Sequence, residues 1–186
     1  MLDAVLEKLI AERHIPGLAI AIQQGNTRLH EGYYGYANLE HQVKVNPQTV
    51  FEIASVTKLF TAQAVLHLAQ EKQLQLDDPI AKYVTNLPTT WNAVTIRHCL
   101  AHQSGIPNYT SLDRYWELQR ASKSPHQVLD LVRDLPLSFA PGSRHSYDNT
   151  GFYLLGMLIE AVTQKSYGDY LHQLIFEPLG MTSTRA

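Results

Sequence analysis

The sequence predicts an α+β fold in which a helical region accompanies an antiparallel sheet. Two segments near the N-terminus, 17–24 and 27–36, flank a dipeptide suited to a hairpin turn, and apolar residues follow helical spacing from Val56 onward. Strands and helices do not alternate along the chain, which argues against a parallel sheet built from βαβ units. We therefore expect one N-terminal β-hairpin, belonging to an antiparallel sheet, followed by a long helical region.

The first elements are predicted to be a helix and the hairpin. Residues 2–13 carry apolar side chains at helical spacing, so we expect an amphipathic helix that ends before Pro16. Strands at 17–24 and 27–36 flank the dipeptide Gly25-Asn26. Both of these residues tolerate positive φ, which a tight hairpin turn requires.

A helix that is buried on nearly all sides is predicted to follow Val56, because its apolar residues cover most of a helical circumference. These residues are Leu59, Phe60, Ala62, Val65, Leu66, Leu68 and Ala69.

Capping residues mark the later helices. Asp78 and Ser124, each followed by a proline, and Ser166 are predicted N-caps, and Thr95 is predicted to cap a segment that reaches His102. Residues 151–163 form another strongly apolar helix in this interpretation.

Composition excludes several classes of partner. The 186 residues include 15 Lys+Arg and 17 Asp+Glu, for a formal net charge of -2, and no basic run occurs. We therefore expect no nucleic-acid partner. No apolar stretch approaches the roughly 18 residues that a bilayer span needs. The acidic start of the chain is unlike a signal peptide, so no export signal is expected in these residues.

The first candidate catalytic residues are Ser55 and Lys58 in the segment Phe51–Lys58. At spacing i, i+3 on a helix their side chains share a face. Burial disfavours the ammonium form of a lysine, so a lysine in this place can act as a base toward the serine hydroxyl. If Ser55 opens the buried helix, the N–H groups of that end also favour an oxyanion. The spacing alone is weak evidence, because it arises often by chance.

A second group, Tyr147-Asp148-Asn149, lies between the turn Pro141-Gly142 and the apolar helix. A phenol and an amide two residues apart in an extended segment project to the same side. Tyr147 can then pass protons between Ser55 and a leaving group, and Asn149 can hold a substrate amide. A purely structural alternative is open, in which Tyr147 lies at the edge of a core and Asn149 caps the following helix.

These residues resemble the penicillin-recognising serine hydrolases, in the branch with class C β-lactamases, D-alanyl-D-alanine carboxypeptidases and β-lactamase-like esterases. The likeness extends in order along the chain. The similar segments are Phe51–Lys58 for the nucleophile, Leu76–Ile80 for L-D-D-P, Thr95–Pro107 for I-R-H-L-L-T-H-T-S-G-I-P, Pro141–Gly156 for P-G-x-x-x-x-Y-S-N-x-G-Y-x-L-L-G, and Phe176–Met181 for F-x-P-L-G-M. Asp148, Cys99 and Gln103 depart from the family's usual Ser, Leu and Thr, and none of these changes removes a catalytic atom.

The resemblance implies a serine hydrolase that forms an acyl-enzyme on an ester, amide or β-lactam carbonyl. Ser55 would be the acylated nucleophile, Lys58 its proton acceptor, Tyr147 the general base and acid, and Asn149 a contact to the substrate amide. No metal or organic cofactor is implied, and the partner would be a small-molecule or peptide substrate. An esterase or D-peptide hydrolase is favoured over a dedicated β-lactamase. Family resemblance favours a periplasmic or secreted location, and a cytoplasmic one stays open.

The family's third element, K-T-G or H-x-G after the tyrosine motif, has no match. The only H-x-G is His30-Glu31-Gly32, which lies upstream on the hairpin. The resemblance therefore implies one β-lactamase-like domain over 1–186, with a helix and hairpin at 1–50 and a helical region at 51–186. It also implies that this domain is truncated and lacks most of a five-stranded antiparallel sheet and its closing helix. Because that element supplies one oxyanion donor, turnover by this chain is expected to fall by about 10²–10³-fold.

A lone hairpin is marginally stable and leaves unpaired strand edges. We therefore expect the polypeptide to form a homo-oligomer, to pair with a complementing chain, or to be truncated, and a compact stable monomer in gel filtration would contradict this.

The alternative function is a non-catalytic half-domain that binds penicillin-like or peptide ligands or pairs with a partner. A reading frame that continues into K-T-G or H-x-G would support the enzyme.

Other reactive residues are expected to be structural. The histidines at 98 and 102 lack a third metal ligand. The single cysteine is expected to be a buried apolar residue. Aromatic side chains that follow Gly105 are expected to serve packing more than specificity at the border of a cleft; these are Tyr109, Tyr115 and Trp116.

Overall fold

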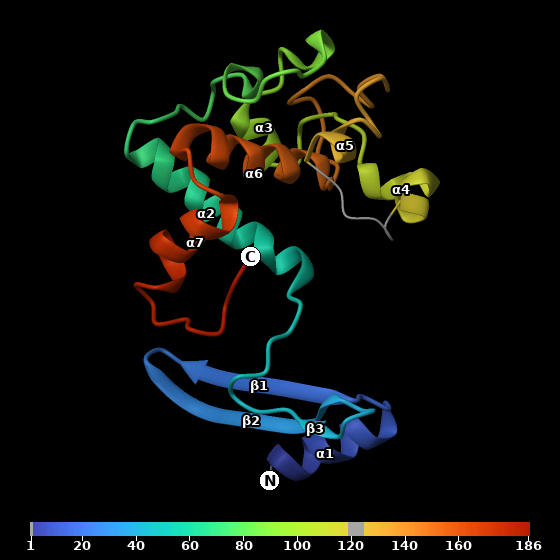
Figure 1. The fold of residues 1–186 in the computed structure, drawn as a ribbon, viewed down its shortest axis with the longest axis vertical. Coiled ribbons are helices and arrows are strands. Elements are labelled where there is room, and N and C mark those ends of the chain that lie inside the picture. The colour runs from blue at the N-terminus through green and yellow to red at the C-terminus, as the bar shows by residue number, and fades with distance from the viewer. Residues whose placement is uncertain (1, 119–124) are drawn as a thin grey trace. The chain divides into compact units, whose positions relative to one another are not determined.

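The computed structural model describes residues 2–118 and 125–186. The chain divides into two compact units, Met1–Glu52 and Ile53–Ala186. The first contains a helix and a three-stranded antiparallel sheet, and the second contains the other helices (Figure 1). The predicted α+β class is confirmed.

The first unit contains the predicted helix and hairpin. Helix α1 spans Leu2–Glu12, and strands β1 (Gly17–Gln24) and β2 (Thr27–Asn38) pair antiparallel with Gln24 opposite Thr27. Gly25 has a φ of +56° in the turn, as predicted. A third strand, β3 (Val43–Lys44), pairs with the end of β2. It escaped prediction because two residues are too few to show alternation.

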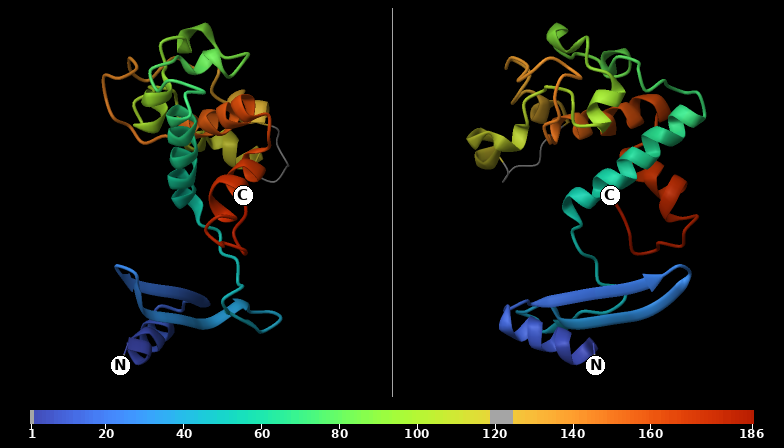
Figure 2. Two further views of the ribbon diagram at one scale, coloured as in Figure 1. Left: turned by 90° about the vertical axis from the view of Figure 1, so that its left-hand side faces the viewer. Right: turned by 180° about the vertical axis from the view of Figure 1, so that it is seen from behind.

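The second unit is built around helix α6 (Thr150–Thr163), which contacts α2 (Thr57–Gln70), α3 (Ile96–Leu100), α5 (Pro125–Leu129) and α7 (Tyr167–Leu171). Helix α4 spans Asp113–Leu118. Figure 2 shows α2 and α6 packed beside one another. The buried residues of α6 include Leu154, Leu155, Leu158 and Ile159. No helix in the described part of the chain is long and apolar enough to cross a bilayer.

Helix α2 is not buried on nearly all sides, so that prediction was wrong. Its buried residues are Thr61, Ala64, Val65 and Leu68. Leu59 and Leu66 are 71% and 46% exposed. They are seven residues apart and therefore lie on one stripe of the helix, which the described residues leave open to solvent.

Two of the predicted caps are confirmed, and one was wrong. The Thr95 hydroxyl accepts a hydrogen bond from His98 N, and the Ser166 hydroxyl accepts one from Asp169 N. Asp78 does not cap a helix, because Pro79 is extended with a ψ of 136° and the 3₁₀ turn begins only at Ile80. The Asp78 carboxylate instead accepts hydrogen bonds from Gln75 N and the Tyr83 hydroxyl. The predicted cap at Ser124 lies outside the described residues.

The packing of α6 predicts a large loss of stability for Leu158→Ala. Leu158 is fully buried, so its removal leaves a cavity and should lower the free energy of unfolding by about 2–5 kcal/mol. The matched control is Leu59→Ala on the exposed stripe of α2, which should change stability by less than about 0.5 kcal/mol. Urea unfolding of the 186-residue chain measures both. A large loss in Leu59→Ala would show that this stripe is covered in solution.

Candidate active site

Ser55 lies at the entrance to helix α2. It belongs to a 3₁₀ turn, Ala54–Val56, that runs directly into the α-helix, and Ala54 before it has a φ of +44°. Left-handed backbone is costly for alanine, so this turn stores strain at the position that presents Ser55. Lys58, one turn further on, donates a hydrogen bond from Nζ to Ser55 Oγ at 3.3 Å. The predicted sharing of one helical face is confirmed.

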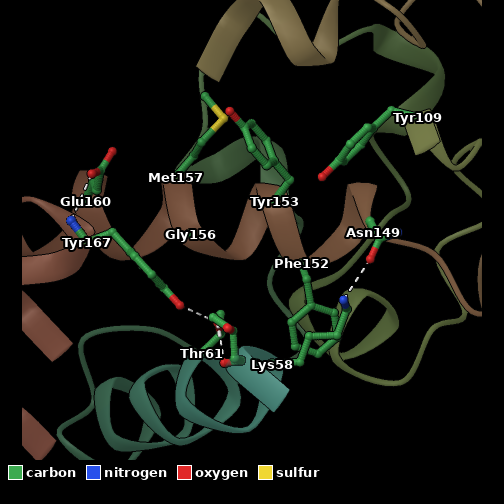
Figure 3. A pocket seen from close by; sticks show the side chains of 11 residues that line it. Lys58, Thr61, Tyr109, Asn149, Phe152, Tyr153, Gly156, Met157, Glu160 and Tyr167 are labelled. Carbon is green, nitrogen blue, oxygen red and sulfur yellow. Dashed lines mark hydrogen bonds between the residues drawn. The ribbon is translucent and has the colours of Figure 1, made fainter. Parts of the chain in front are cut away.

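Tyr147 and Asn149 reach the same place from the segment before α6. The Tyr147 hydroxyl lies 2.7 Å from Ser55 Oγ. Lys58 Nζ also donates to Asn149 Oδ1 at 2.7 Å (Figure 3). Because Lys58 Nζ donates to Ser55 Oγ as well, the lysine bridges the serine and the amide. Hydrogen bonds therefore connect all four residues singled out in the sequence.

Asn149 does not serve as a helix cap, although it occupies the N-cap position of α6. The neighbouring Asp148 caps the helix in its place, because its Oδ1 accepts a hydrogen bond from Gly151 N at 2.5 Å. The Asn149 amide donates from Nδ2 to Asn108 Oδ1 at 3.3 Å and to Thr110 Oγ1 at 3.0 Å. These contacts fix which way the amide faces and direct its oxygen to Lys58.

Asn108 and Thr110 were not predicted as site residues. They follow Ile106-Pro107, at the end of the segment that begins with the Thr95 cap. The signal in the sequence is weak, since short polar side chains after a proline are typical of ordinary turns.

The phenol of Tyr147 is more acidic than an ordinary tyrosine. Hydrogen bonds from Lys58 and then from Ser55 lower the pKa of Tyr147, and they outweigh the opposing effect of burial. Lys58 Nζ also lies 4.9 Å from the centre of the Tyr147 ring. A cation beside a phenol favours the phenolate, so the group next to Ser55 is shifted toward the form that accepts a proton.

A groove of about 320 Å³ leads away from Lys58 and Asn149 along α6. Phe152, Tyr153 and Met157 line it, and Thr61, Glu160 and Tyr167 lie at the end remote from Asn149 (Figure 3). Gly156 leaves room there, since a Cβ at this position would have only one neighbour within 4 Å, Tyr167 at 3.8 Å. The walls are mostly apolar, which suits an apolar group of a bound molecule.

The three aromatic residues after Gly105 differ in position. Tyr109 lines the groove, whereas Tyr115 packs on Tyr109 with ring centres 5.0 Å apart. Trp116 is 57% exposed.

The cysteine and the two histidines singled out in the sequence make local contacts. Cys99 is fully buried, and burial raises the pKa of its thiol, which disfavours a reactive thiolate. His98 Nδ1 accepts a hydrogen bond from Thr95 N, and His102 Nδ1 accepts one from Asp148 N. Among residues 2–118 and 125–186, no group of three or more metal-ligating side chains is found.

Comparison with known proteins adds a family assignment to this geometry. The sequence model of a family described as Beta-lactamase matches residues 2–186. Protein flp of Staphylococcus aureus (strain NCTC 8325 / PS 47) is 36% identical over 189 residues, which cover 98% of this chain and 37% of that protein.

Two solved structures are similar as well. The octameric penicillin-binding protein homologue from Pyrococcus abyssi matches with a TM-score of 0.83 and 36% identity, over 97% of this chain and 42% of that one. A D-amino acid amidase from Ochrobactrum anthropi SV3, complexed with D-phenylalanine, matches with a TM-score of 0.80 and 30% identity, over 95% of this chain and 49% of that one. The chain thus spans less than half the length of each of these relatives.

Proposed function

The chain belongs to the beta-lactamase family, and from that premise we propose that it carries the nucleophile half of a serine hydrolase that forms an acyl-enzyme on an ester, amide or β-lactam carbonyl. One observation carries the proposal. Ser55 Oγ lies 2.7 Å from the hydroxyl of Tyr147, and the pKa of that phenol is lowered chiefly by Lys58. A weak nucleophile next to a group poised to take its proton is the arrangement that acyl transfer requires.

In the proposed reaction, Ser55 Oγ attacks the carbonyl carbon while its proton passes to the oxygen of Tyr147. The carbonyl electron pair moves to oxygen, and the resulting oxyanion faces the N-terminal end of α2. The oxyanion then collapses, the bond to the leaving group breaks, and Tyr147 returns its proton to that group. Water hydrolyses the acyl ester with Tyr147 again as the base, which regenerates Ser55.

Lys58 has a supporting role in this scheme. It donates hydrogen bonds to Ser55 and to Asn149, and the same charge favours the phenolate form of Tyr147. We therefore assign the serine proton to Tyr147 and the stabilisation of that phenolate to Lys58. Asn149, held by Asn108 and Thr110, would contact the substrate amide.

The groove along α6 would hold the acyl group of the substrate. Its walls include the aromatic rings of Phe152 and Tyr153, which suit an aromatic or aliphatic substituent. The similar D-amino acid amidase, with D-phenylalanine bound, makes an amide of an apolar D-amino acid a reasonable substrate class. An esterase or D-peptide hydrolase is therefore favoured over a dedicated β-lactamase.

Gly156→Leu tests this subsite. The leucine side chain would fill the groove, so kcat/KM for p-nitrophenyl phenylacetate should fall about tenfold or more, with kcat/KM for the acetate ester within about twofold of the native value. Gly156→Ala is the matched control, since its Cβ meets only Tyr167 at 3.8 Å and both esters should react normally. Equal losses on both esters in Gly156→Leu would argue against a substrate groove.

We also propose two features of the whole protein. A second oxyanion donor would come from a K-T-G or H-x-G strand that follows Ala186 in a longer protein. A homo-oligomer or a complementing chain would cover the strand edges of the first unit, and gel filtration tests this.

The alternative function, a half-domain that binds penicillin-like or peptide ligands without turnover, keeps the same acylable serine.

The test of the proposed function is intact mass after incubation with an acyl donor. The protein is treated in parallel with a p-nitrophenyl ester and a penicillin, and the modified residue is located by peptide mapping. We expect one acyl group on Ser55, with the more effective donor separating an esterase from a penicillin-recognising protein. A stable adduct without turnover would favour the binding alternative. No adduct from either donor on the complete gene product would refute the assignment of Ser55.

A further inference from the structure

We propose that His102 is a positioning residue for Tyr147 and holds the phenol against Ser55 by accepting a hydrogen bond on its unprotonated Nδ1. This inference rests on the proposed function, because positioning matters only if Tyr147 takes the proton of Ser55. The proposal assigns a role to His102. This histidine makes no hydrogen bond to Ser55 in the described part of the chain, and the family resemblance assigned no role to it.

His102 is bonded to the backbone on both sides of Tyr147. Ser146 N donates to the carbonyl oxygen of His102 at 2.8 Å, and Asp148 N donates to its ring Nδ1 at 3.3 Å. The ring itself lies 4.6 Å from the ring of Tyr147, between centres, and 5.1 Å from that of Phe152. One residue thus ties the chain before and after the phenol and packs on its face, so it controls where the hydroxyl lies.

The backbone of His102 has a φ of +56°, the left-handed conformation in which helices commonly end, and it directly follows the C-cap of α3. Gln103 N donates to the carbonyl oxygen of His98 at 2.8 Å and His102 N donates to that of Cys99 at 3.3 Å, the pair of hydrogen bonds typical of such an end. The imidazole supplies an acceptor and a packing face together, which glycine cannot do.

The acceptor role requires a neutral ring with its proton on Nε2. Protonation of Nδ1 would place an N–H against the N–H of Asp148 and break the contact. Burial lowers the pKa of His102 and so keeps the ring neutral near pH 7.

The charged and titratable groups around His102 act in both directions. The buried Asp148 carboxylate, 4.0 Å from Nδ1, favours protonation of His102. His145, whose ring centre lies 5.8 Å away, and Lys58 disfavour protonation. Tyr147 contributes its ring face. Because burial is the largest of these influences, protonation of His102 is expected only below the ordinary range of a histidine.

The predicted consequence is a second acidic step in the pH profile. Native kcat/KM should fall with decreasing pH as Tyr147 becomes protonated, and it should fall further when His102 takes up a second proton. Asparagine suits the left-handed backbone and offers an oxygen in place of Nδ1, but it cannot be protonated. His102→Asn should therefore keep kcat within about threefold of native near pH 7 and lose the second step.

The experiment measures p-nitrophenyl acetate hydrolysis by the complete gene product across pH, with thermal unfolding as the check on folding. His102→Ala, which lacks the acceptor, should lower kcat about 10–100-fold with KM within about twofold. His145→Asn is the matched control and should keep both acidic steps.

A second step that persists in His102→Asn, or equal losses of kcat in the alanine and asparagine variants, would overturn the role of His102 alone. If His102→Ala does not fold, the pH profile of His102→Asn decides by itself. A native protein that forms no Ser55 adduct would overturn the proposed function, and the role of His102 with it.

Discussion

Ser55→Ala should abolish the acyl adduct and lower kcat/KM by about 10⁴–10⁶-fold. The alanine removes the only atom that can form the acyl ester in the proposed reaction and leaves Tyr147 with no serine proton to accept. Ser55 is exposed, so the fold should not suffer. Hydrolysis of a p-nitrophenyl ester and intact mass measure the two effects.

Ser183→Ala is the matched control for this variant, since Ser183 is an exposed serine remote in sequence from every site residue. It should acylate and turn over like the native protein. A native-like adduct on Ser55→Ala would mean that another nucleophile reacts, and peptide mapping would identify it. Thermal unfolding at native temperature would show that lost activity reflects chemistry and not misfolding.

The candidate site was largely predictable from the sequence because its residues occur in short local patterns. Ser55 and Lys58 are one helical turn apart, and Tyr147 and Asn149 are two residues apart in an extended segment. Such spacings determine which side chains share a direction. The meeting of the two pairs is a long-range contact, and the sequence predicted it only through resemblance to a known family.

Features that depend on neighbours distant in sequence were missed or misjudged. The prediction that α2 is buried on nearly all sides was wrong, because Leu59 and Leu66 are exposed. The spacing of apolar residues indicates which faces of a helix are apolar, but it does not indicate which segments pack against them. The structural alternative of Asn149 as a helix cap is excluded, because the carboxylate of Asp148 caps α6 in its place. The support of the Asn149 amide by Asn108 and Thr110 comes from a separate loop and has no local signature.

Asp78 shows the limit of capping rules. An aspartate before a proline at a helix start is a good N-cap candidate, but Pro79 is extended and the 3₁₀ turn starts one residue later. The carboxylate then satisfies Gln75 N and Tyr83 instead. The residue type was informative about hydrogen bonding, and only the backbone conformation could show which groups it would meet.

Lys58→Met is expected to lower kcat/KM about 10²–10⁴-fold at pH 7 and to move the pH profile toward higher pH. The hydrogen bond from Lys58 is the largest cause that lowers the pKa of Tyr147, so its loss should raise that pKa toward the usual value for tyrosine. Activity that requires the phenolate appears as pH rises through the pKa of Tyr147. The variant should therefore recover part of its activity at high pH, where the phenol ionises without help.

The pH dependence of the loss separates the two assignments of the proton acceptor. If Tyr147 is the base and Lys58 its support, the deficit of Lys58→Met shrinks as pH rises. If Lys58 itself takes the serine proton, the methionine variant lacks the base at every pH and no recovery occurs. Tyr147→Phe completes the comparison, because it keeps the ring beside His102, loses the hydroxyl 2.7 Å from Ser55, and should show no recovery at high pH. Recovery in Tyr147→Phe together with none in Lys58→Met would reverse the roles proposed for these two residues.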